Sequence, residues 1–108
     1  MPLAIYIQNV YTRKQADVNF EWDEGKNEAN VAKHGISFLA ATRIFDGPTL
    51  EFVDERRGYG ETRVAAIGAI GEADLLVIYT MRGDTCRIIS ARRANQNERR
   101  AYRQIFPR

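Results

Sequence analysis

The spacing of the apolar residues changes from helical to strand-like after residue 46, and this change limits the folds that the chain can adopt. Between residues 37 and 46, Phe38, Ala41, Thr42 and Phe45 recur at helical spacing. Four short segments rich in residues that favour β-strands follow: residues 50–53, 63–70, 75–82 and 85–93. Breaks that contain glycine separate these β-rich runs. No helix-length segment lies between any two of these runs. This argues against parallel crossovers and predicts an antiparallel meander whose last two strands form a hairpin at Gly83-Asp84.

Two helices are predicted before the strands. Asp23 is suited to cap a helix that runs to about His34, where Gly35 ends it. Ser37 begins a second helix, which ends at Asp46-Gly47-Pro48. The buried face of this second helix has the spacing i, i+3, i+4, i+7 and consists of Phe38, Ala41, Thr42 and Phe45.

A third helix begins after the last strand, where Asn95 and Glu98 have the pattern of a capping box. The predicted fold is therefore α+β, with an antiparallel four-stranded sheet, two N-terminal helices and one C-terminal helix, all packed on one face of the sheet. We assign residues 19–108 to this domain and residues 1–18 to an N-terminal extension. The apolar run at residues 3–10 is either an added strand or a floppy segment.

Size and composition narrow the class of protein. The 108 residues suffice for one domain with one modest core, and 44% of them are apolar. The one cysteine, Cys86, forms no internal disulfide, and one histidine with one cysteine does not build an ordinary zinc site. The chain has no apolar run of about 18 residues and no secretory signal pattern, so we expect a cytoplasmic protein without a membrane span.

Charge is unevenly distributed along the chain. Residues 82–108 carry eight arginines against two acids, whereas residues 1–81 carry eight Lys or Arg against twelve Asp or Glu. The total of +2 therefore combines a C-terminal portion at +6 with an N-terminal portion at −4. Arginine outnumbers lysine thirteen to three, and its planar fork matches a phosphate edge better than a lysine does. This pattern predicts a polyanion or an acidic protein as partner.

Arg92 and Arg93 directly precede the predicted third helix. A helix N-terminus carries unpaired amides and partial positive charge, so two arginines ahead of one suit a phosphate site. Neighbours on an extended strand point to opposite faces, so the two do not share one role. The alternative is that one of them pairs with Glu98 or another carboxylate while the other is solvated.

A second group of candidate site residues, all polar or charged, lies on the predicted sheet. Glu61 and Arg63 are two residues apart and face the same way, as do Thr80 and Arg82. If the helices leave that face open, the two pairs line a cleft with one carboxylate and two guanidinium groups. The alternative is an ordinary solvent-exposed sheet face.

Two further residues are candidates for proton transfer. His34, beside Lys33 at a helix C-terminus, is placed to act as acid or base, or is only a surface residue where the helix stops. Tyr102 lies among arginines and is either a proton donor, a base-stacking residue or a core residue with its hydroxyl at the rim.

Three segments together resemble the BrnT family of bacterial toxins: FEWDEGKNEANVAKHGISFLAATRIFD (20–46), GETRVAAIG (60–68) and DLLVIYTMRGDTCRIISARRANQNERRAY (74–102). Their order and spacing match over roughly residues 19–104, and the elements KHG-x-SF and RIISARRA…ER…Y are specific as a pair. The resemblance implies a RelE-like fold and a ribonuclease toxin of a type II toxin-antitoxin system. It also implies an RNA substrate and a BrnA-like antitoxin, bound as a heterotetramer. Toxins of that fold use no metal or cofactor, and the 2′-hydroxyl of the RNA attacks the adjacent phosphate.

From these observations we predict a set of site residues. The catalytic candidates are His34, Glu61, Arg63, Arg82, Arg92, Arg93 and Tyr102. The RNA-binding candidates are Lys33, Thr80, Arg99, Arg100 and Arg103. In this scheme the four catalytic arginines bind the scissile phosphate, His34 or Glu61 is the base, and Tyr102 is the acid.

The sequence departs from the family pattern at two places. Relatives often carry acids where this chain has Leu39-Ala40, and often a histidine at about the position of Arg57. The second departure removes any proton transfer that a histidine there performs. A rival hypothesis from another class is a non-catalytic basic module that binds an acidic protein or DNA.

Overall fold

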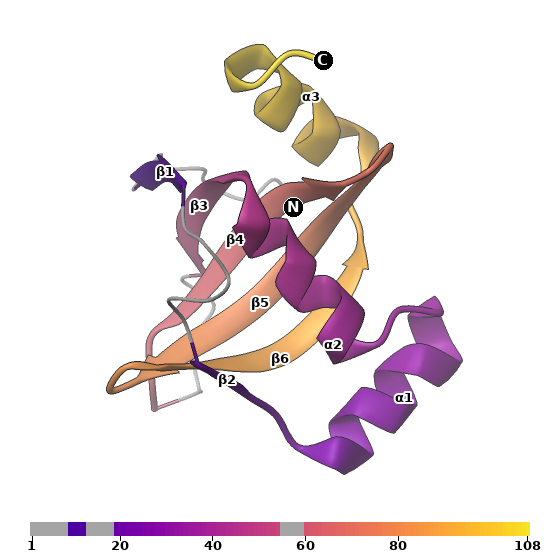
Figure 1. Ribbon diagram of the computed structural model, residues 1–108, viewed down its shortest axis with the longest axis vertical. Coiled ribbons are helices and arrows are strands. Elements are labelled where there is room, and N and C mark those ends of the chain that lie inside the picture. The colour runs from indigo at the N-terminus through magenta and orange to yellow at the C-terminus, as the bar shows by residue number, and fades with distance from the viewer. Residues whose placement is uncertain (1–8, 13–18, 55–59) are drawn as a thin grey trace.

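The structure is a computed structural model, and it describes residues 9–12, 19–54 and 60–108 (Figure 1). In chain order its elements are β1 (Asn9–Thr12), β2 (Asn19–Glu21), α1 (Glu24–His34), α2 (Phe38–Ala41), the 3₁₀ helix η2 (Thr42–Asp46), β3 (Pro48–Asp54), β4 (Arg63–Ile70), β5 (Ala73–Arg82), β6 (Thr85–Arg93) and α3 (Gln96–Ile105).

One sheet organises these elements, with the strand order β1-β3-β4-β5-β6-β2. Its centre, β3 to β6, is the predicted antiparallel meander, which is confirmed. The prediction of only four antiparallel strands is wrong, because β2 pairs in parallel with β6 and β1 extends the β3 edge. Strand β2 has only three residues, so the alternation that marks a strand in a sequence does not develop there.

The predicted helix boundaries at α1 and α3 are confirmed by their caps. The Asp23 side chain accepts from the Lys26 amide, and Gly35 ends α1 in the left-handed conformation at φ 72°. Asn95 and Glu98 form both hydrogen bonds of a capping box at α3.

The predicted second helix is shorter than expected and tightens into η2 after Ala41. The physical reason lies in its contact with the sheet. A Cβ at Gly68 of β4 would lie 2.8 Å from Cβ of Ile44, so the missing side chain lets η2 approach the strand closely. Ile44 and Phe45 are both fully buried there, which a regular α-helix achieves less readily for adjacent residues.

The helices cover both faces of the sheet, which corrects the prediction of a single covered face. On β4, Ala66 packs into the core beneath α2 and η2, whereas Ala65 and Ile67 pack into a second core with Tyr102 of α3. Alternation along the strand therefore divides the apolar residues between two cores. The sequence pattern of the β-rich runs is nearly continuous, as expected when both faces are buried.

Helix α3 covers only one end of its face. It lies beside the β4–β5 turn, and the β5–β6 turn is at the opposite end of the sheet (Figure 1). The Tyr102 hydroxyl donates to the carbonyl of Pro48, at the start of β3, at 2.8 Å. The far end of this face, where β4 begins and β5 ends, carries polar and charged side chains in place of a core. In the part of the chain that the structure describes, no helix is long and apolar enough to cross a membrane.

Candidate active site

Glu61 bridges two arginines at the end of the sheet that α3 does not cover. Its Oε2 lies 3.3 Å from Nε of Arg63, and its Oε1 lies 3.7 Å from Nη2 of Arg82. Arg63 begins β4 and Arg82 ends β5, which antiparallel pairing places side by side, and Glu61 lies two residues before β4. Alternation puts Arg63 and Arg82 on the same face as Ala65 and Ile78, the face of α3.

Thr80 positions this group. Its hydroxyl, which is buried, donates to the carbonyl of Thr62 at 2.6 Å. Thr62 lies between Glu61 and Arg63, so this hydrogen bond holds the backbone that carries both. We call Glu61, Arg63, Thr80 and Arg82 the Glu61 cluster.

Two residues beside the cluster were absent from the predicted site. Arg87 of β6 lies opposite Thr80 in the register and forms an ion pair with Glu21 of β2 at 3.0 Å. Asp54 of β3 is buried and lies opposite Arg63. The family resemblance includes Arg87, and its register opposite Thr80 is the signal that would have placed it with the cluster.

Arg92 is held by Glu98, as the alternative interpretation allowed. Its two terminal nitrogens donate to the two carboxylate oxygens of Glu98 at 2.9 Å each. The Glu98 side chain is buried, which by itself would raise its pKa, but the Arg92 hydrogen bonds and the Asn95 amide hold the pKa below its ordinary value of 4.5. Arg92 therefore anchors the start of α3 to β6.

The structure does not bring Arg92 or Arg93 to the Glu61 cluster. Arg92 pairs in register with Leu76, which is six residues before Arg82 on β5 and therefore about 20 Å away along the strand. Arg93 is exposed and, by alternation, lies on the face of α1 and α2. The predicted convergence of four arginines around one phosphate is thus limited to Arg63 and Arg82.

Lys33, predicted to bind RNA, and the remaining proton-transfer candidates also lie apart from the cluster. Lys33 and His34 are exposed in the last turn of α1, which packs against β6. Tyr102 is 2% exposed, and its hydroxyl is engaged with the Pro48 carbonyl. Burial raises the pKa of Tyr102, so this phenol stays protonated and serves as a structural donor.

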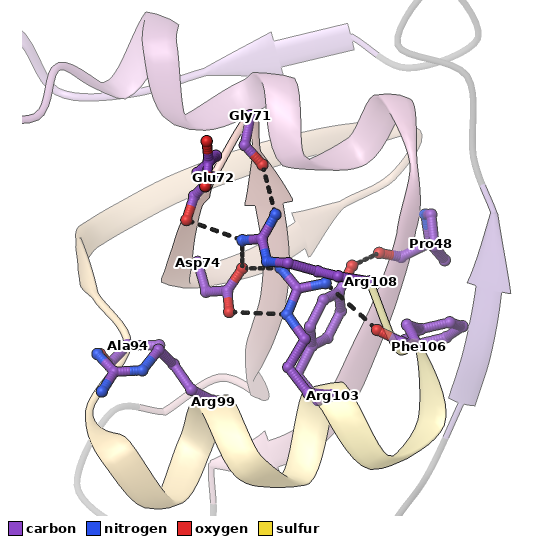
Figure 2. A network of polar contacts seen from close by, with 10 residues as sticks. Pro48, Gly71, Glu72, Asp74, Ala94, Arg99, Arg103, Phe106 and Arg108 are labelled. Atoms are coloured by element: carbon purple, nitrogen blue, oxygen red, sulfur yellow. Dashed lines mark hydrogen bonds and ion pairs between the residues drawn. The ribbon is translucent and has the colours of Figure 1, made fainter.

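The other predicted RNA-binding residues line a pocket on α3. This open pocket of about 600 Å³ lies between α3 and the β4–β5 turn, and we call it the α3 pocket. Its charged lining consists of Glu72, Asp74, Arg99, Arg100, Arg103 and Arg108. Figure 2 shows the guanidinium groups of Arg103 and Arg108 gathered at Asp74, while Arg99 extends away from it.

Chemically, the Glu61 cluster combines a base with fixed positive charge. A carboxylate has about four lone-pair sites, so Glu61 retains acceptor capacity beyond its two ion pairs. Its side chain is 27% exposed and that of Arg82 is 56% exposed, so a substrate can reach both. Among the residues that the structure describes, no three His, Cys, Asp or Glu side chains gather in a way that could hold a metal ion.

Comparison with known proteins identifies the family. A search of curated proteins gives no significant match. A family model described as the ribonuclease toxin BrnT of type II toxin-antitoxin systems matches residues 22–98, which include the whole Glu61 cluster. The match covers well over half of the chain, and the chain therefore belongs to the BrnT family of ribonuclease toxins.

Proposed function

We propose that this toxin is a metal-independent endoribonuclease and that the Glu61 cluster is its active site. The observation that carries the proposal is the Glu61 carboxylate held between Arg63 and Arg82 on an accessible end of the sheet. The family is one of ribonucleases, which favours cleavage over the rival hypothesis of a module that only binds.

In the proposed reaction, the 2′-hydroxyl of a nucleotide attacks its own 3′-phosphate. Glu61 accepts the hydroxyl proton, and Arg63 and Arg82 stabilise the charge that develops on the phosphate oxygens. Proton transfer neutralises Glu61 at the moment when the phosphate gains charge. The positive charge of the two guanidinium groups is then no longer offset by the carboxylate, so it stabilises the transition state more than the ground state.

The leaving 5′-oxygen receives a proton from solvent in this scheme. The described part of the cluster contains no His, Cys or Tyr side chain, and Tyr102 is buried elsewhere. General acid catalysis of this step typically contributes 10²–10⁴-fold, so a reaction that lacks it is slow and depends on positioning and electrostatics.

Type II toxins have a protein antitoxin, and we propose that the partner of this chain is BrnA-like and forms a heterotetramer with it. An acidic antitoxin surface that covers the Glu61 cluster would pair with the exposed Arg82. Inhibition then follows from exclusion of RNA.

The experiment compares the two candidate bases in purified toxin. Glu61→Gln keeps the shape but not the basicity, and we expect RNA cleavage to fall by about 10²–10⁴-fold. His34→Gln, on α1, should change the rate by less than about twofold, within the ordinary effect of a surface substitution. Cleavage is measured in EDTA, and the products are analysed for a 2′,3′-cyclic phosphate.

Three results would count against the proposal. Loss of activity in His34→Gln with full activity in Glu61→Gln would assign the base to α1. Cleavage that stops in EDTA and returns with a divalent cation would contradict metal independence. Cleavage of RNA whose 2′-hydroxyls are all methylated would contradict attack by that hydroxyl.

A further inference from the structure

Arginines also gather at the other end of the sheet, where the α3 pocket carries four of them against two acids. Its formal charge is therefore +2. The Asp74 side chain is only 4% exposed and is shared by Arg103 and Arg108. These two guanidinium groups also donate to the carbonyls of Phe106, Gly71 and Glu72, so they are fixed in place.

Arg99 and Arg100 differ from these fixed arginines. Both are exposed, and neither forms an ion pair with a carboxylate in the described part of the chain. The hydrogen bond from Arg99 to the Ala94 carbonyl is long, at 3.5 Å. Since a guanidinium has five N–H donors, both residues have donors to offer a ligand. The pocket thus has two rigid cations at its base and two adaptable ones at its rim.

We propose that the α3 pocket binds a backbone phosphate of the RNA substrate, away from the bond that is cleaved. The positive charge and the planar fork of the arginine side chains favour an oxyanion as the ligand. The polar character of the pocket lining favours RNA over a protein as the source of that oxyanion. Protein interfaces have apolar, often aromatic, centres, whereas nucleic-acid interfaces are polar and positively charged. Pro107 is the one apolar side chain among the described residues that line this pocket.

The distance between the two regions sets the length of RNA that uses both. Asp74 and Arg82 are eight residues apart on β5, which is about 26 Å along a strand. A nucleic-acid strand with the rise of B-DNA, about 3.4 Å per nucleotide, covers this in about eight nucleotides. This step rests on the proposed function, because it places the cleaved bond at the Glu61 cluster. A dinucleotide at that cluster cannot reach the α3 pocket.

Binding is tested first, with a probe whose binding can be measured without RNA cleavage. The probe is a labelled single-stranded oligonucleotide, fully 2′-O-methylated, of at least the length that spans both regions. In the double variant Arg99→Ala/Arg100→Ala we expect Kd to rise about tenfold. The slope of log Kd against log salt should fall by about 0.7 for each lost phosphate contact. Alanine is the best helix former, so α3 should remain folded.

A matched control removes two exposed positive charges elsewhere. Lys26→Ala/Arg43→Ala changes α1 and η2, which pack on the opposite face of the sheet. Its Kd and salt slope should stay close to those of the unchanged toxin. An equal loss of affinity in both double variants would show a general effect of net charge and would overturn the assignment of a site.

Cleavage kinetics then locate the contact. With an unmodified RNA of spanning length, Arg99→Ala/Arg100→Ala should raise KM about tenfold and leave kcat unchanged. With a dinucleotide, both constants should match those of the unchanged toxin. Equal KM values for the variant and the unchanged toxin on long RNA would overturn the proposal.

Affinity for the antitoxin tests the alternative that the α3 pocket binds a protein. If the double variant binds the probe normally but loses affinity for the antitoxin, the pocket is a protein-docking surface and the proposal is wrong. Failure of the proposed function is seen separately. In that case Glu61→Gln would cut RNA normally, while the methylated probe would still depend on Arg99 and Arg100.

Discussion

The Glu61 cluster and the α3 pocket contain the same chemical arrangement in different surroundings. In each, one carboxylate lies between two arginines: Glu61 with Arg63 and Arg82, and Asp74 with Arg103 and Arg108. The Glu61 side chain is 27% exposed, whereas that of Asp74 is 4% exposed. The two carboxylates lie at opposite ends of the same strands.

Burial decides what each arrangement does. A buried carboxylate that loses its cations is strongly destabilised, so Asp74 is tied to its structural role. The Glu61 ion pairs are only partly buried and Arg82 is exposed, so Glu61 and Arg82 can exchange partners with a substrate at a smaller cost. In the proposed function, similar ion pairs therefore maintain the fold at one end of the sheet and serve catalysis at the other.

The largest expected effect is on catalysis at the exposed end. Arg82→Ala removes a cation that stabilises the transition state in the proposed function, so the rate of RNA cleavage should fall by about 10²–10³-fold. The free energy of unfolding should change by no more than about 0.5 kcal/mol, because the side chain is exposed and its ion pair is long. Single-turnover cleavage and urea denaturation measure the two quantities, with Arg43→Ala as control. A loss of stability large enough to explain the lost activity would contradict the contrast drawn between the Glu61 cluster and the α3 pocket.

The next effect is on stability at the buried end. Asp74→Asn leaves two guanidinium groups without their counter-charge, and we expect the free energy of unfolding to fall by about 1–3 kcal/mol. Cleavage of a dinucleotide by the folded protein should be unchanged, since the substitution is far from the Glu61 cluster. Urea denaturation monitored by circular dichroism gives the first result. Unchanged stability would mean that burial of Asp74 does not make its ion pairs structural.

The smallest effect concerns pH and the ion pair of Arg92 with the buried carboxylate of Glu98. The pKa of Glu98 is below 4.5 in the folded protein, so the unfolded chain binds the proton more readily. Its stabilising contribution is complete above the unfolded pKa and is lost as pH falls through the folded pKa. The free energy of unfolding should therefore decline in this acidic range. The free energy of unfolding should decline less steeply with falling pH in Glu98→Gln. Equal slopes for the variant and the unchanged toxin would show that Glu98 does not contribute to the pH dependence of stability.

Local signals in the sequence predicted much of the secondary structure. The caps at Asp23, Gly35 and Asn95, and the turn at Gly83-Asp84, act over a few residues, so they can be recognised without knowledge of the fold. The antiparallel meander followed from the short connections between β-rich runs. Strand β2 could not be predicted, because three residues form a strand here only when β6 is available to pair with them.

The candidate site was predicted in part for the same reason. Glu61 and Arg63, like Thr80 and Arg82, are two residues apart, and their shared direction follows from strand geometry alone. Whether two such pairs meet depends on the register of β4 against β5, which brought them together. The spacing of Arg92 to Glu98 does not reveal that Glu98 is buried. The sequence therefore left two interpretations open, and the pairing of Arg92 with the buried carboxylate of Glu98 selected the structural one.

By itself, the sequence determined the family, the helix caps, the meander and the supply of arginines, because each depends on residue types at short or fixed spacing. Only the tertiary structure decided which sheet face each helix covers, which carboxylates are buried and which arginines remain available. Those properties depend on contacts between segments far apart in the chain. Solvent exposure, which distinguishes the structural ion pairs of Asp74 from the ion pairs proposed to act in catalysis, exists only once those contacts have formed.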